Sequence, residues 1–254
     1  MVVFDRVARV FPALACAALM LTARSAHADW NWGWGKSVKG SGVVKTETRR
    51  VSGFTHISLS IPASAEVVQG STEGVTVEGD DNIVPLIETV VEDGKLKIRF
   101  TEKNMSVSTK LLKVVVNAKT VEGLSVAGSG DLRAAKLQSA NLKVSIAGSG
   151  DAHITHLDAD LLKVSIAGSG NFAASGKAKT VETSIAGSGD LKIGKLEANT
   201  VKVSVAGSGD ATVWAKEALK ISVAGSGDVK YYGDAQVSKS VAGSGSVKRL
   251  GAAP

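Results

Sequence analysis

The chain has 254 residues, a formal net charge of +6, 28 glycines and one cysteine, Cys16. Because a lone cysteine has no partner within the chain, a disulfide-stapled fold is excluded. Lysine and arginine are spread along the sequence without a cluster, which argues against nucleic acid as a partner.

Residues 1–28 have the pattern of a secretory signal peptide. Arg6 and Arg9 give a basic start, an apolar stretch follows at 10–21, and the sequence AHA at 26–28 fits a cleavage site. The apolar stretch is short for a membrane span, so we expect cleavage in preference to anchoring and no transmembrane segment in the mature chain. The sequence therefore predicts an exported protein, located in the periplasm, at the cell surface or outside the cell.

The next two segments show no visible repeat. Residues 29–45 are rich in tryptophan, glycine and lysine and are predicted to form a linker. Residues 46–120 alternate apolar and polar residues in short stretches between turn signals, which is typical of β-strands. One short helix is expected at 83–91, where Pro85 restricts it to a late start. We expect 46–120 to supply the degenerate first turns and the cap of the array that follows.

Residues 121–250 contain a repeat. The tetrapeptide AGSG recurs at intervals of 18–20 residues, beginning at Ala127, Ala147, Ala167, Ala186, Ala206, Ala224 and Ala242. Between these tetrapeptides, apolar residues occupy every second position, as in Leu142, Val144 and Ile146, which indicates strands with one buried face. The sequence therefore predicts an all-β fold, a parallel β-helix or β-roll solenoid with about 18–20 residues per coil and glycines at its corners.

Three kinds of polar residue recur at fixed positions in the repeat. If the coils stack in register, each kind forms a column on an outward face. The acids directly after AGSG are Asp131, Asp151, Asp190, Asp210 and Asp228. The serines two residues before AGSG include Ser145, Ser165 and Ser204. The lysines four residues before AGSG include Lys143, Lys163 and Lys202. These residues are the candidate ligand-binding positions.

The acidic column requires an explanation, because neighbouring carboxylates about 4.8 Å apart repel by roughly 1 kcal/mol in water. One explanation is that each carboxylate accepts backbone N–H bonds at the corner, in an Asx turn. Calcium binding is a second, but calcium-binding β-rolls place a residue between Gly and Asp, which this repeat lacks. Catalysis by paired carboxylates is a third, but it needs two different environments and a column offers one. The first is favoured, and no cofactor, metal site or catalytic residue is predicted.

The sequence also resembles a known family. The run RRVSGF at 49–54, the segment VEGDDNIVPLIETVVEDGKLKI at 77–98 and the series of GSGD turns resemble the bacterial family called putative auto-transporter adhesin, head GIN domain. The resemblance covers roughly residues 46–250. It implies an exported, β-helical protein of the cell envelope and carries over no site residue.

Together these observations predict a non-enzymatic envelope protein that binds polysaccharide or a cell surface through a repetitive face. One alternative is a structural spacer whose copies stack end to end into homo-oligomers. The other is an enzyme that cleaves polysaccharide.

Overall fold

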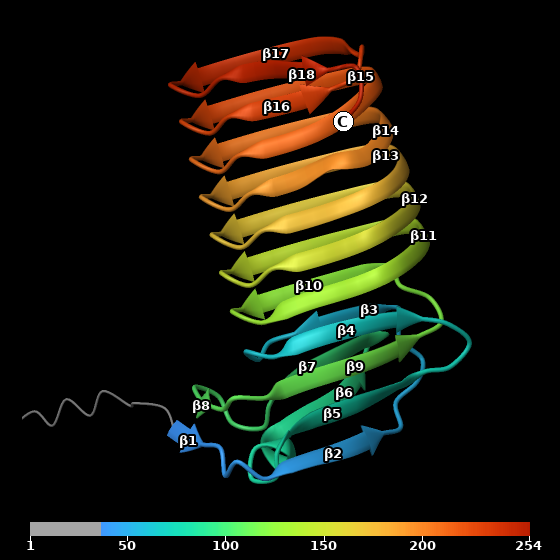
Figure 1. Ribbon diagram of the computed structural model, residues 1–254, viewed down its shortest axis with the longest axis vertical. Helices are drawn as coiled ribbons and strands as arrows, with labels where there is room; N and C mark the ends of the chain where they lie inside the picture. The colour runs from blue at the N-terminus through green and yellow to red at the C-terminus, as the bar shows by residue number, and fades with distance from the viewer. Residues whose placement is uncertain (1–36) are drawn as a thin grey trace, which may run out of the picture. The chain divides into compact units, whose positions relative to one another are not determined.

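The computed structural model describes residues 37–254. They form stacked β-coils, which Figure 1 shows with the long axis vertical, and the one helical element among them is a 3₁₀ turn, η1 (Val84–Leu86). The predicted all-β parallel solenoid is therefore confirmed. The signal peptide expected at 1–28, and the linker expected at 29–45 up to residue 36, lie outside the described residues.

The first part of the described chain is a block of short strands. They are β1 (Ser37–Lys39), β2 (Val44–Arg49), β3 (His56–Leu59), β4 (Ser64–Gln69), β5 (Gly74–Asp80), β6 (Ile87–Glu92), β7 (Lys95–Phe100), β8 (Ser106–Ser108) and β9 (Leu112–Ala118). Within this block β5 pairs antiparallel with both β2 and β9, and β6 pairs antiparallel with β7. The block therefore closes one end of the stack with antiparallel strands.

Regular coils follow, and their strands run parallel. They are β10 (Gly123–Gly128), β11 (Asp131–Gly148), β12 (Ala152–Gly168), β13 (Phe172–Gly187), β14 (Leu191–Gly207), β15 (Ala211–Gly225), β16 (Val229–Tyr232), β17 (Gln236–Gly243) and β18 (Val247–Gly251). β10 pairs in parallel with β3 of the first block and with β11 of the coils, so one buried core runs through both parts.

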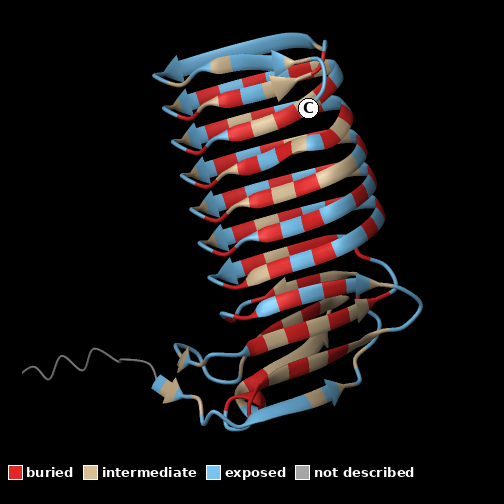
Figure 2. Cartoon of the chain, viewed as in Figure 1, coloured by how far each residue is buried: buried red, intermediate tan, exposed pale blue. Residues whose placement is uncertain are grey.

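Alternation of apolar and polar residues shapes each coil. Figure 2 shows buried and exposed residues in turn along the strands. The buried ones are mostly aliphatic. In β11 the alternation is broken twice, at 135–136 and at 140–141, where two successive residues are exposed. Each break marks a bend, because a coil that turns must present two neighbouring residues outward. The bends and the AGSG corner divide the coil into three sides.

Two structural constraints, backbone conformation and close contact between coils, explain the glycines of the AGSG tetrapeptide. The first glycine has a positive φ, between +95° at Gly128 and +133° at Gly225, which favours a residue without a Cβ. The second glycine lies against the preceding coil, and a Cβ on Gly170 would fall 2.1 Å from the carbonyl oxygen of Gly150. Both glycines are therefore required for coils to stack at hydrogen-bonding distance.

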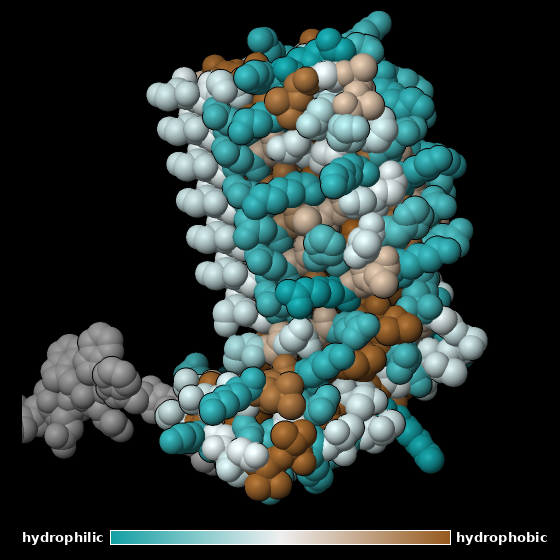
Figure 3. Space-filling model, in the orientation of Figure 1, coloured by the Kyte–Doolittle hydropathy of each residue, from teal (hydrophilic) through white to brown (hydrophobic). Residues whose placement is uncertain are grey.

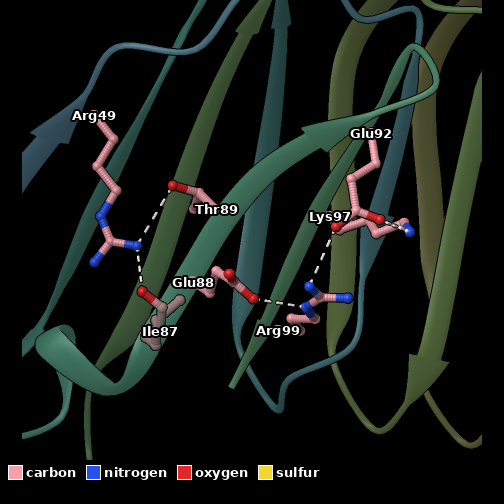
Figure 4. Close-up of polar contacts among 7 residues, drawn as sticks. All are labelled: Arg49, Ile87, Glu88, Thr89, Glu92, Lys97 and Arg99. Atoms are coloured by element: carbon pink, nitrogen blue, oxygen red, sulfur yellow. Dashed lines mark hydrogen bonds and ion pairs between the residues drawn. The ribbon is translucent and has the colours of Figure 1, made fainter. Parts of the chain in front are cut away.

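Polar side chains hold the first block together (Figure 4). Arg49 of β2 donates to the carbonyl oxygens of Ile87 and Val84, the second at 2.9 Å. On the neighbouring strands, Arg99 Nε lies 2.7 Å from Glu88 Oε2, and a second nitrogen of Arg99 lies 3.3 Å from Glu92. Lys97 of β7 also pairs with Glu92. Lys97 and Arg99 of β7 are therefore matched by acids on β6.

The helix expected at 83–91 is not present. Pro85 lies in the first turn of η1, and the chain then extends as β6, whose residues 89–91 are all β-branched. β6 pairs with β7 along its whole length, so the strand pairing supplies the backbone hydrogen bonds that a helix would have made internally.

Candidate functional site

The predicted serine column is present on the side of each coil that precedes the AGSG corner. Ser145 pairs in register with Ser165, and the same register relates every coil. The column is longer than the repeat alone indicates, because Ser58 of β3 pairs with Ser125 of β10. Its members are Ser58, Ser125, Ser145, Ser165, Ser184, Ser204, Ser222 and Ser240.

A charged column runs beside the serines on the same side. From β7 to β17, its positions are Lys95, His56, Gly123, Lys143, Lys163, Glu182, Lys202, Lys220 and Ser238. The register therefore brings together the lysines that the sequence singled out. His56 and Lys95 were missed because they lie in the first block, which carries no AGSG to mark the position.

Two positions of the charged column differ from the lysine pattern. Gly123 has no side chain, and a Cβ there would lie 2.1 Å from Cδ2 of His56, so the imidazole occupies that space. Glu182 replaces a lysine, and its Oε2 lies 3.0 Å from Nζ of Lys163. Glu182 could have been recognised from its place four residues before AGSG. The column therefore has a pair of lysines on either side of the acid at Glu182, and uncharged Gly123 and Ser238 beyond them.

The surface along this column is hollowed. One hollow of about 400 Å³ is lined by His56, Glu122, Asn141, Leu142, Lys143, Leu161 and Lys163. A second, of about 330 Å³, shares Lys163 with the first. A third, of about 470 Å³, shares Glu182 and Lys202 with the second. Because neighbouring hollows share lining residues, they form a shallow trough across the strands, which we call the lysine trough.

The acidic column lies on the far side of the AGSG corner from the lysine trough. The AGSG corners themselves form a pale ridge of small residues along one edge of the stack in Figure 3. Ser145 and Lys143 precede the positive-φ glycine Gly148, whereas Asp151 follows the corner and begins the next side. The candidate residues are therefore split between two sides of the solenoid.

Four of the five acids, Asp151, Asp190, Asp210 and Asp228, accept hydrogen bonds from the next coil and form a ladder between coils. Oδ1 of Asp210 accepts the backbone N–H of Asp228 at 2.9 Å, and Oδ1 of Asp228 accepts the N–H of Ser246 at 2.9 Å. Asp151 and Asp190 accept from the next coil in the same way. The expectation that these carboxylates accept backbone N–H groups is met, but the donor belongs to the following coil and not to an Asx turn of the same corner.

The ladder has electrostatic consequences. The hydrogen bonds from the Ser246 hydroxyl and backbone N–H, with a smaller contribution from Lys230, hold the pKa of Asp228 below its ordinary value. Asn171 occupies the same column, where its Oδ1 accepts the N–H of Asp190 at 3.1 Å. An amide therefore serves in this position as well as a carboxylate, so the hydrogen bond does not require the charge.

Within residues 37–254, no group of three or more histidine, cysteine, aspartate or glutamate side chains is arranged to hold a metal ion. In the same range, no helix has the length and apolar character needed to cross a membrane.

The C-terminal end of the stack is open. All eight residues of β17 are exposed, including Val237 and Val241, and β17 pairs with β15 alone. Lys239 takes the inward position that Ile221 holds one coil earlier. In β18, Arg249 aligns with Tyr231 of the preceding coil and forms an ion pair with Asp234. This end therefore combines unpaired strand edge with charged side chains in positions that are apolar elsewhere.

Proteins of known structure share this architecture. No curated protein matches the sequence. A crystal structure described as a putative adhesin from Bacteroides fragilis is 29% identical, with a TM-score of 0.80, and covers 84% of this chain and 100% of its own. One described as a putative lipid binding protein from Parabacteroides distasonis is 26% identical, with a TM-score of 0.72, covering 85% and 100%.

A third structure, described as a putative adhesin from Parabacteroides merdae, is 22% identical, with a TM-score of 0.68. It covers 85% of this chain and 100% of its own, and it has the same fold. The family model described as putative auto-transporter adhesin, head GIN domain, matches residues 53–235. That match runs from just before β3 of the first block through most of the regular coils, and the chain belongs to this family.

Proposed function

We propose that the protein is an exported, non-enzymatic component of the cell envelope that binds polysaccharide, on its own or as part of a cell surface, through the lysine trough and the serine column beside it. The observation that carries this proposal is the continuity of the trough across successive coils, with a serine repeated in register in each coil and a lysine in four of them. A repeated surface suits a polymer, because many weak contacts along one chain add up to useful affinity.

The family and its structural neighbours support the same assignment, since most are described as adhesins. The description of one neighbour as a lipid binding protein suggests another ligand. The middle hollow of the trough is less suited to a lipid, because every residue that lines it except Val164 has a charged or hydroxyl side chain. An enzyme that cleaves polysaccharide is also less well supported, because the acids are used in the hydrogen-bonded ladder between coils.

A binding experiment tests this proposal. The purified protein is incubated with isolated envelope fractions and defined polysaccharides, in calcium and again in chelator, and bound material is recovered. We expect glycan binding that persists in chelator and that falls when Lys143, Lys163 and Lys202 are changed together to glutamine. Binding that disappears in chelator, or that is unchanged in the triple variant, would remove the lysine trough from the proposal.

The acidic ladder provides the matched control. Changing Asp151, Asp190 and Asp210 together to asparagine keeps the hydrogen-bond acceptors of the ladder and removes three charges on the other side of the corner. We expect glycan binding by this variant to equal that of the unaltered protein. Loss of binding would mean that the acidic side, and not the trough, holds the ligand. Shortening of the polysaccharide during incubation would favour the enzyme alternative.

A further inference from the structure

The charges of the lysine trough narrow the class of polymer that it can hold. Its lining includes four lysines and two glutamates, which are Lys143, Lys163, Lys202, Lys220, Glu122 and Glu182. One glutamate is already paired with Lys163. The trough therefore presents an excess of positive charge to a ligand, and an anionic ligand gains most from it.

The lining also lacks the aromatic side chains that hold uncharged ligands. In the part of the chain that the structure describes, no tryptophan, tyrosine or phenylalanine lines the three hollows, and His56 supplies the one ring. Aromatic faces are the usual platforms for bases of single-stranded nucleic acid. Flat apolar sugar faces pack on such rings for the same reason, so without them the binding of a sugar here depends more on charge and hydrogen bonds.

Hydroxyl groups flank the charged column on both sides. Ser165, Ser184 and Ser204 border it on the side toward the corner, and Thr180 and Thr200 border it on the other. Each hydroxyl can donate one hydrogen bond and accept others, which suits ligands that carry hydroxyl groups of their own. A row of lysines flanked by hydroxyl groups suits a polysaccharide with acidic substituents better than a polyanion that has no hydroxyl groups.

The arrangement of the lysines indicates how such a polymer lies. Lys143 and Lys163 are on adjacent coils, as are Lys202 and Lys220, and Glu182 separates the two pairs. Adjacent parallel strands are about 4.8 Å apart, so the pairs are arranged in line along the solenoid axis. A ligand that contacts both pairs must therefore run across the strands.

We propose that the lysine trough binds a linear anionic polysaccharide lying along the solenoid axis, with acidic groups at the Lys143–Lys163 and Lys202–Lys220 pairs. Glu182 between the pairs limits the density of charge that the ligand can carry. This proposal rests on the proposed function, of which it specifies the substrate class.

The test compares polymers of different charge. Polygalacturonate carries carboxylates, dextran sulfate carries sulfates, polyphosphate carries anionic groups without sugar, dextran is neutral, and a DNA duplex is a polyanion of another class. Binding of each to the purified protein is measured by biolayer interferometry at low and at physiological salt. We expect the two acidic glycans to bind, dextran not to bind, and affinity to fall as salt rises.

Three variants locate the site. We expect Lys202→Gln with Lys220→Gln to weaken binding of the acidic glycans roughly tenfold, because two contacts of one multivalent ligand are lost. Lys177→Gln with Lys195→Gln removes the same charge from positions outside the trough and should leave binding unchanged. Glu182→Gln removes the acid between the lysine pairs and should strengthen binding of the densely charged dextran sulfate.

The possible results separate this inference from the proposed function. Dextran binding as tightly as the acidic glycans would overturn the anionic class and leave polysaccharide binding intact. Tighter binding of polyphosphate or DNA than of either glycan would overturn the assignment to a sugar polymer. Equal loss in the Lys177 and Lys195 variant would place the site elsewhere. Binding of no glycan at all would overturn both proposals.

Discussion

At the scale of single residues, the two glycines and the serine of the AGSG corner are subject to different structural constraints. The first glycine adopts a backbone conformation that a side chain disfavours, and the second makes room for the coil before it. The serine between them is exposed in every copy. The sequence alone shows that the tetrapeptide repeats. It does not show that, from Gly148 on, the first glycine is restricted by both its positive φ and contact with the preceding coil, whereas the second is restricted by contact, because that contact arises only after coils stack.

Gly170→Ala tests the contact between coils. A Cβ at this position would lie 2.1 Å from the carbonyl oxygen of Gly150 and 2.7 Å from Cγ2 of Ile146, so the backbone must shift. We expect the free energy of unfolding to fall by about 2–4 kcal/mol. Ser169→Ala, in the same corner but exposed, should change it by less than about 0.5 kcal/mol. Chemical denaturation measures both, and equal effects would contradict the role given to Gly170.

Two substitutions of Asp210 test the contribution of the acidic ladder to stability. Asp210→Ala leaves the backbone N–H of Asp228 without its side-chain acceptor, whereas Asp210→Asn keeps an acceptor oxygen. We expect the alanine variant to lose about 1 kcal/mol of stability. The asparagine variant should match or exceed the unaltered protein, since it also removes one repulsive charge from the column. An asparagine variant as unstable as the alanine variant would show that the carboxylate charge itself is required.

A pH dependence follows from Asp228. Hydrogen bonds from Ser246 lower the pKa of this carboxyl in the folded protein, so its ionised form stabilises the fold. That stabilisation is fully present above the ordinary pKa of an aspartate, about 3.9, and is lost as the pH falls through the lower folded value. We expect thermal stability to decline in this acidic range, and Asp228→Asn to reduce the decline. A melting series between pH 2 and pH 6 compares the two proteins.

At the scale of strands, the regular coils were predictable and the first block was not. Val144, Val164 and Val203 occupy equivalent places in their repeats, and the structure stacks them in one inward column. In the first block, β4 lies beside both β9 and β11, although neither is close to it in sequence. No repeat marks those partners, so the pairing depends on long-range contacts that a local pattern does not reveal.

In the edge strand β17, one inward-facing lysine opposes pairing with another strand. Its inward positions are Val237, Lys239 and Val241, and a charge among apolar residues opposes pairing with another strand edge. We expect Lys239→Ile to increase self-association in sedimentation velocity experiments across a range of protein concentrations. Ser238→Ile adds the same side chain at an outward position and should associate less. If the unaltered protein already forms long assemblies, the end-to-end alternative is favoured instead.

At the scale of the whole molecule, equivalent coils are interchangeable. Residues 151–170 make one full repeat, and their removal would join Gly150 to Asn171 without changing which residues face inward. We expect this deletion to give a folded protein with a lower melting temperature, because one interface between coils is lost. Removal of 151–160, half a coil, should destroy the stack beyond that point. Circular dichroism and thermal melting distinguish the two outcomes.

The two ends of the stack differ in a way that bears on how the chain assembles during synthesis. The antiparallel strands β2, β5 and β9 complete their pairing within the first 118 residues, so this end can form before any repeat has emerged. Each later coil can then pair with the exposed strand edge of the coil before it, and it exposes a new strand edge of its own. In β17 and β18, Lys239 and Arg249 take positions that Ile221 and Tyr231 hold one coil earlier, so the edge that these strands present is a poorer template for a further coil.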